Sequence, residues 1–172
     1  MTMEHKAFAF DYDGFERELR PLLQEALVSE SPESLVAFVK RDLARFCDPY
    51  EGDQLQDDWE NLVEAKDVHQ YGDFALTKYY NPAADIGLGS EWEEIRVVVE
   101  RELGTSASVL GRPLAAQGRV FDPGKMGSYF QSRLDIERNI AQLERLDEPR
   151  LKPLAMMLDK ARAARTGLYV TF

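Results

Sequence analysis

The sequence has little of several features that would place it in a special class. It has one cysteine, Cys47, among 172 residues, so it cannot form an intramolecular disulfide. No uninterrupted apolar run approaches the roughly 20 residues of a membrane span, and no apolar signal region follows the charged first residues. We therefore expect a cytoplasmic protein in a reducing compartment, without a membrane partner.

The composition is typical of a folded domain and not of a disordered chain. Hydrophobic residues make up 44% of the sequence and aromatic residues 10%, whereas disordered segments are poor in aromatics and have little to bury. The length is sufficient for a hydrophobic core, and neither an internal repeat nor a long linker divides the chain. We expect one globular domain over residues 1–172.

Basic residues are scarce in the first part of the chain. The sequence has 21 Lys and Arg against 31 Asp and Glu, a net charge of −10. Residues 105–172 contain 11 basic and 7 acidic residues, a balance of +4, which leaves 10 basic and 24 acidic residues in 1–104, a balance of −14. Such a negative field repels nucleic acid and attracts basic partners, so we expect no binding to nucleic acid.

Apolar residues follow strand spacing at the two ends of the chain and helical spacing over most of the rest. Aromatics alternate over residues 7–12, and residues 168–172 form a β-prone run. Helical stripes are found in 15–27, 35–46, 68–80, 92–103, 136–146 and 151–161, and shorter β-prone runs in 108–110, 120–121 and 128–130. The pattern predicts a helix-dominated α+β fold, with a small, mostly antiparallel sheet of short strands that includes both termini.

Polar residues and prolines mark where the helices are expected to begin. Three pairs have the spacing of a capping box: Asp57 with Glu60, Ser90 with Glu93, and Ser132 with Asp135. Pro21 lies within the first helical stripe, where it either kinks the helix or begins its continuous part. The sequence alone leaves both alternatives open.

The segment from Phe8 to Gly14 resembles the first motif of haloacid-dehalogenase-type phosphatases, in which a hydrophobic strand ends in Asp-x-Asp-Gly. The resemblance implies a nucleophile at Asp11 and a general acid at Asp13. It is confined to this segment, because the family usually has Thr where this chain has Phe15, and its later strands with Ser or Thr, Lys and an acidic pair are missing here. We interpret the segment as a strand that leads to a helix cap at Asp13.

Other segments that could hold a cofactor or metal have structural interpretations. Gly87 and Gly89 precede a helix, but the acidic residues of its first turn would repel a phosphate. His69 and Asp73 share a helical face, yet the chain has only two histidines and its acidic spacing matches no calcium loop. We interpret that face as solvated, and we predict neither a cofactor nor a metal site.

The first functional hypothesis is a protein-binding module of the immunity or inhibitor type. Residues 48–73 contain nine carboxylates and a single lysine, a balance of −8. Charge complementarity of this kind accelerates association and selects a basic partner protein. The candidate partner-binding residues are Asp53, Asp57, Asp58, Glu60, Glu64 and Asp67.

The alternative hypothesis is an enzyme or a small-ligand binder that uses the loop at 111–130. This segment contains four glycines, two prolines and several basic residues, which is a composition typical of functional loops. The candidate ligand-binding residues are Arg112, Arg119, Lys125 and Tyr129, with the cations placed to hold an anionic group. No catalytic residue and no oligomeric state follow from the sequence.

Overall fold

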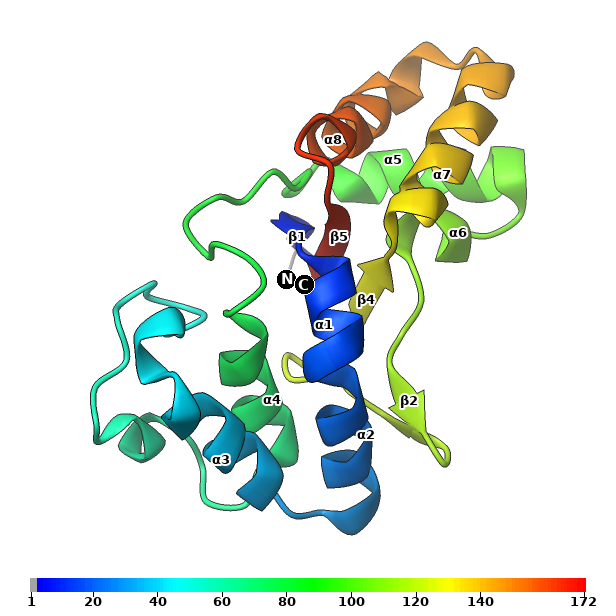
Figure 1. Ribbon diagram of the computed structural model, residues 1–172. Coiled ribbons are helices and arrows are strands. Elements are labelled where there is room, and N and C mark those ends of the chain that lie inside the picture. The colour runs from blue at the N-terminus through cyan, green and yellow to red at the C-terminus, as the bar shows by residue number, and fades with distance from the viewer. Residues whose placement is uncertain (1–2) are drawn as a thin grey trace.

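A three-stranded antiparallel sheet lies at the centre of the protein, in a computed structural model that describes residues 3–172 (Figure 1). Strand β5 (Gly167–Thr171) is in the middle and pairs with β1 (Lys6–Phe10) on one side and β4 (Ser128–Gln131) on the other. Phe8 lies opposite Tyr169 in β5, and Phe130 lies opposite the same tyrosine from β4. The prediction of a small antiparallel sheet of short strands that includes both termini is confirmed, and the fold is α+β with 51% of the chain helical.

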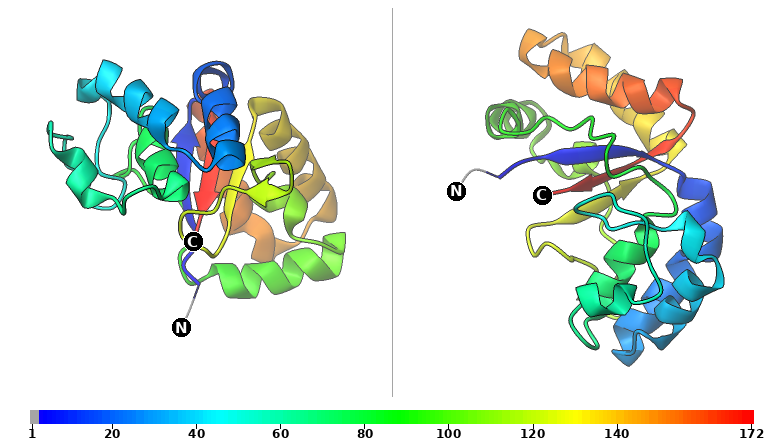
Figure 2. Two further views of the ribbon diagram at one scale, coloured as in Figure 1. Left: turned by 90° about the horizontal axis from the view of Figure 1, so that it is seen from below. Right: turned by 90° about the vertical axis from the view of Figure 1, so that its left-hand side faces the viewer.

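Each face of the sheet buries a separate hydrophobic cluster, because neighbouring residues of a strand point to opposite faces. The aromatic face carries Phe8, Phe10 and Tyr169 and packs on the helices formed by the first half of the chain. The aliphatic face carries Ala7 and Val170 and packs on helices of the second half. Figure 2 shows the resulting three layers, with the sheet between two helical layers.

The helices of the two layers follow one another along the chain. The first layer contains α1 (Tyr12–Glu18), α2 (Arg20–Ser29), α3 (Glu33–Arg41) and α4 (Val68–Leu76), with the short 3₁₀ turns Leu43–Arg45 and Trp59–Leu62 between α3 and α4. The second contains α5 (Trp92–Leu103), the short α6 (Ala107–Leu110), α7 (Arg133–Leu146), the 3₁₀ turn Pro149–Leu151 and α8 (Lys152–Ala163). A two-stranded ribbon of β2 (Ala115–Ala116) and β3 (Arg119–Val120) contacts α2. The β-prone run at 108–110 is helical, so the prediction of a strand there was wrong.

The first helical stripe is divided into two helices. Helix α1 ends at Glu18 and α2 begins at Arg20, with Pro21 in its first turn, where the missing N–H costs no hydrogen bond. Asp11, and not Asp13 as predicted, is the N-cap of α1, because its Oδ1 accepts from the backbone N–H of Gly14 at 3.0 Å. A Cβ atom on Gly14 would lie 2.4 Å from the Asp11 carboxylate, so the cap at Asp11 and the glycine three residues later have a common structural reason.

The three predicted capping boxes have different outcomes. Ser132 and Asp135 form one at the start of α7, as predicted. Ser90 does not cap α5, because the backbone from Leu88 to Trp92 already makes a turn and the helix begins one residue after Glu91. Asp57 and Glu60 form no box either, because Glu60 lies within the short 3₁₀ turn Trp59–Leu62, whose N-cap residue is Asp58.

The free edge of β1 is covered by the segment that precedes α5. The backbone of His5 and Gly89 forms two hydrogen bonds of 3.1 and 2.9 Å, and the N–H of Ile86 donates to the Ala7 carbonyl at 2.8 Å. Gly87 allows this close approach, since a Cβ atom there would lie 2.3 Å from the His5 carbonyl oxygen. The segment fixes the position of Asp85, whose Oδ1 accepts from the N–H groups of Ala7 and Gly87.

Within residues 3–172 there is no helix with both the length and the apolar character that crossing a membrane requires.

Candidate functional site

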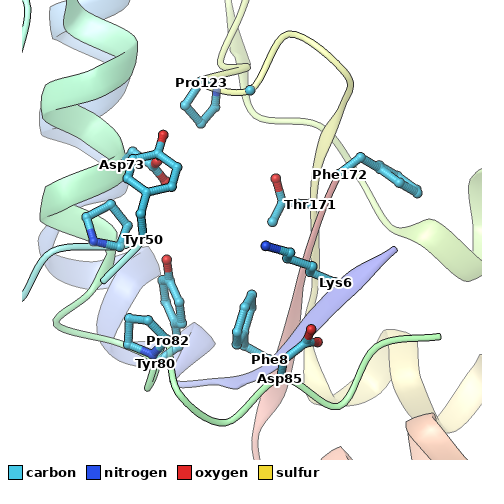
Figure 3. Close-up of a pocket in the computed structure, with 12 residues that line it drawn as sticks. Lys6, Phe8, Tyr50, Asp73, Tyr80, Pro82, Asp85, Pro123, Thr171 and Phe172 are labelled. Atoms are coloured by element: carbon cyan, nitrogen blue, oxygen red, sulfur yellow. The ribbon is translucent and has the colours of Figure 1, made fainter. Parts of the chain in front are cut away.

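A cavity of about 210 Å³ opens beside the aromatic face of the sheet, where β1 and β5 meet the first helical layer. Figure 3 shows its lining, which comes from segments far apart in the sequence. Both segments named in the sequence hypotheses contribute to the lining. The acidic stretch 48–73 contributes Tyr50 and Asp73, and the 111–130 loop contributes Pro123 and Gly124. The remaining lining residues are Lys6, Phe8, Pro49, Tyr80, Pro82, Asp85, Thr171 and Phe172.

The most unusual group in the cavity is the carboxyl of Asp73, which lies on α4 and is only 6% exposed. Its Oδ2 accepts a hydrogen bond of 3.0 Å from the hydroxyl of Tyr50. Burial raises the pKa of Asp73 to about 6, against the opposing effect of the Tyr50 hydrogen bond, and the charge of Asp48 adds to the rise. No Lys, Arg or His side chain of residues 3–172 forms an ion pair with it.

Two further tyrosines lie near enough to Asp73 to be affected by its charge. Burial and then the Asp73 charge raise the pKa values of both Tyr80 and Tyr169, so both remain neutral hydroxyls at physiological pH. The Tyr169 hydroxyl, which is not part of the cavity lining, accepts from the Ser128 Oγ at 3.1 Å. The site therefore combines an acid that titrates near neutral pH with hydroxyl groups that can donate or accept hydrogen bonds.

The opposite side of the cavity carries a positive charge. Lys6 and Thr171 are directly paired in β1 and β5, so their side chains share a face of the sheet. In Figure 3 the Lys6 amino group points into the cavity, across from Asp73 and Tyr50. Asp85 lies near Lys6 at the rim, but no ion pair within 4.0 Å joins them. The oxygen of Asp85 is already engaged by two backbone N–H groups.

The six predicted partner-binding residues are not equivalent. Asp53, Asp57, Asp58 and Glu64 are exposed, and none of them forms an ion pair within the described part of the chain. Glu60 pairs with Lys40 at 2.7 Å. Asp67 is the N-cap of α4, where it accepts from the backbone N–H groups of His69 and Gln70.

The four predicted ligand-binding residues are not brought together. Arg112 forms an ion pair of 2.7 Å with Asp135 of α7. Arg119 lies on the β2–β3 ribbon, where it pairs with Glu30 at the end of α2. Lys125 is exposed at the tip of a turn, and Tyr129 packs edge-on against Phe172. The loop contributes Pro123 and Gly124 to the cavity and none of its basic side chains.

Sequence reasoning missed Asp73, Tyr50 and Lys6 as members of one site. Asp73 was placed on a solvated helical face with His69, but the His69 Nδ1 accepts from the Asp122 N–H at 3.1 Å and its ring stacks on Phe121. One signal was present in the sequence. Asp73 stands next to the apolar run Phe74-Ala75-Leu76, so a helix that buries that run can bury the carboxyl as well.

The residues that the structure describes contain no group of three or more His, Cys, Asp or Glu side chains that could hold a metal ion. Comparison with protein-family models, with curated proteins and with solved structures finds no match to this chain.

Proposed function

We propose that this protein binds a small polar molecule in the cavity between Tyr50, Asp73 and Lys6. The observation that supports this proposal is the buried carboxyl of Asp73, which has a hydroxyl partner and no cationic partner among residues 3–172. Buried carboxylates are normally paired, because removing a charge from water costs several kcal/mol. Groups held in such an unfavourable state are found mainly at functional sites.

The cavity has the mixed lining of a ligand site. The rings of Phe8 and Tyr80 form apolar walls, while Tyr50 and Thr171 offer hydroxyl groups. Its volume of about 210 Å³ lies below the roughly 300–1,000 Å³ of sites for drug-sized molecules, which favours a ligand the size of an amino acid or a monosaccharide. Helix α4 holds Asp73, and strands β1 and β5 hold Phe8 and Thr171, whereas Tyr50 reaches the cavity from a turn.

Thermal denaturation with separate ligand classes tests the proposal. Amino acids, amines, carboxylic acids, monosaccharides and nucleobases are added singly at millimolar concentration, and Tm is measured. A ligand that binds the folded state raises Tm, and the rise grows with the ratio of its concentration to its Kd. We expect at least one class to raise the Tm of the wild type and not of Asp73→Asn.

The matched control is Asp57→Asn, which removes an exposed carboxylate outside the cavity lining. It should respond to the ligands as the wild type does. If no class raises Tm, or if Asp73→Asn responds as strongly as the wild type, the cavity proposal fails.

A second candidate is the binding of a basic cytoplasmic protein at the acidic surface formed by Asp53, Asp57, Asp58 and Glu64. Two observations favour it. These four side chains are exposed without ion pairs in the described chain, and Leu62, between them in sequence, is 60% exposed. An exposed apolar residue among unpaired charges is typical of a protein interface with a polar rim.

Affinity capture from the protein's own cell lysate tests this second candidate. We expect a basic protein that is released by salt, because screening weakens contacts between exposed charges. Replacement of the four carboxylates by their amides, and separately Leu62→Ala, should each abolish its capture, whereas Asp73→Asn should not. A partner captured equally by all variants would contradict the acidic-surface proposal and leave the cavity proposal unaffected.

A further inference from the structure

Three charged side chains line the cavity, the carboxylates of Asp73 and Asp85 and the ammonium group of Lys6, and no ion pair within 4.0 Å joins Lys6 to either carboxylate. Asp73 lies at one side on α4, and Lys6 lies at the other side at the start of β1 (Figure 3). No ion pair within 4.0 Å joins these two residues, and neither has another oppositely charged partner within residues 3–172. Each charge is therefore available to a ligand that enters between them.

The charges of Asp73 and Lys6 differ in how deeply they are buried, so a ligand can bind between them in a defined orientation. Asp73 is 6% exposed, whereas the Lys6 side chain is exposed at the rim. A ligand ammonium group would be desolvated at Asp73, where a charge-assisted hydrogen bond is strong. A ligand carboxylate at Lys6 would remain in contact with water, and the hydroxyl of Thr171, opposite Lys6 in the sheet, would have to exchange its 3.5 Å hydrogen bond to the Gly127 carbonyl to act as a second donor.

We propose that the ligand is a small zwitterion of the amino-acid type, with its ammonium group at Asp73 and its carboxylate at Lys6. This inference rests on the proposed ligand-binding function of the same cavity and specifies its substrate class. A purely cationic ligand would bring its charge near the Lys6 ammonium group, which repels it, and a purely anionic ligand would bring its charge near the Asp73 carboxylate. Asp85 does not take the place of a ligand carboxylate at Lys6, because it lies beyond ion-pair distance and its Oδ1 accepts from two backbone N–H groups. A zwitterion in this orientation has an opposite charge at both ends.

The remaining surface of the cavity indicates what else the ligand carries. Phe8 and Tyr80 present rings with centroids 4.7 Å apart, and Pro82 and Pro123 complete the apolar lining. Burying apolar surface against such walls is favourable. The zwitterion is therefore expected to have an apolar or aromatic side chain, in preference to a second charged group.

Calorimetric titration with three related compounds tests the assignment. L-Phenylalanine has both charges, 2-phenylethylamine lacks the carboxylate, and 3-phenylpropanoate lacks the ammonium group. L-Leucine and γ-aminobutyrate extend the set to other zwitterions. For the wild type at pH 7.5 we expect a zwitterion with an apolar side chain to bind at least tenfold more tightly than either truncated compound.

Two variants assign the ends of the ligand. In Lys6→Met, which keeps the aliphatic stem, the affinity for the zwitterion should fall at least tenfold while that for 2-phenylethylamine does not fall. In Asp73→Asn the affinity for the zwitterion should again fall at least tenfold, while that for 3-phenylpropanoate does not fall. Asp57→Asn is the matched control and should bind as the wild type does.

The outcomes separate this inference from the function on which it rests. If 2-phenylethylamine or 3-phenylpropanoate binds the wild type as tightly as the zwitterions, or if no zwitterion binds, the zwitterion assignment is wrong. It is also wrong if both variants bind zwitterions normally. A sugar or nucleobase that binds only when Asp73 is intact would support the cavity proposal while overturning the ligand class, and the absence of any ligand would overturn both.

Discussion

The hydroxyl of Tyr50 donates a hydrogen bond of 3.0 Å to the carboxyl of Asp73, and this contact joins the loop after α3 to the middle of α4. The two residues differ greatly in environment, because Tyr50 is 70% exposed and Asp73 is 6% exposed. The tyrosine therefore connects the solvent side of the cavity with its buried acid. A contact of this kind can respond to a ligand that competes for the carboxyl.

Asp73→Asn should stabilise the protein at neutral pH. The pKa of Asp73 rises from its ordinary value of 3.8 to about 6 on folding, mainly through burial. The folded state thus holds the proton more tightly than the unfolded state does, so the contribution of Asp73 to stability is greatest below pH 3.8 and is lost as pH rises through 6. This rise corresponds to about 3 kcal/mol, which the amide avoids because it carries no charge.

Chemical denaturation at pH 4 and at pH 7.5 measures this effect. The difference in unfolding free energy between Asp73→Asn and the wild type should move in favour of the variant as pH increases. Asp57→Asn should show a difference within about 0.5 kcal/mol at both values. A less stable Asp73→Asn at pH 7.5 would mean that the carboxylate supports the fold, which removes the main argument for a ligand site.

His5 should make the protein sensitive to acid. Its ring is fully buried between Trp92 and Phe172, its Nδ1 accepts from the Leu88 N–H at 3.3 Å, and its Nε2 has no partner within the described chain. Burial lowers the pKa of His5 from 6.5 to about 4, although the charge of Asp85 opposes this. The contribution of His5 is therefore fully present above pH 6.5 and is lost as pH falls through 4, by about 3 kcal/mol in total.

Comparison of the wild type with His5→Phe isolates this contribution. The phenylalanine keeps the aromatic contacts and cannot take up a proton, so its stability relative to the wild type should increase between pH 7 and pH 4. Because Asp73 acts in the opposite direction over nearly the same range, the comparison is best made in the Asp73→Asn background. A constant difference between the two proteins across this range would show that His5 does not titrate there.

The elements of the fold could be predicted because they depend on local patterns. Alternating aromatics at Phe8 and Phe10 indicated a strand with one buried face, and Ser132 with Asp135 indicated the start of α7 correctly. The capping signal at Ser90 gave a wrong prediction, because backbone groups in the turn from Leu88 to Trp92 hydrogen-bond to one another. There the side chain of Ser90 is not needed as a cap.

The site could not be predicted because it depends on contacts between distant segments. Lys6, Tyr50 and Asp73 meet only after β1 pairs with β5 and the loop after α3 folds over α4. Net charge was also misleading, because counting Asp73 with the acidic stretch assigned a solvated position to a carboxyl that is buried. Charge counts describe a surface only when burial is known.

Gly87→Ala should destabilise the protein through the edge of β1. The added Cβ atom would lie 2.3 Å from the His5 carbonyl oxygen and 2.7 Å from the Ala7 nitrogen, both of them backbone atoms of the strand. Backbone cannot move aside as a flexible side chain can, so we expect a loss of about 1–3 kcal/mol of unfolding free energy.

Gly52→Ala is the comparison, because Gly52 has a φ of +77° with open space around it and should show only the smaller cost of left-handed backbone. Denaturant titration of both variants measures the difference. Equal losses would mean that the segment before α5 can move away from β1, and the position of Asp85 at the cavity rim would then not be fixed by that contact.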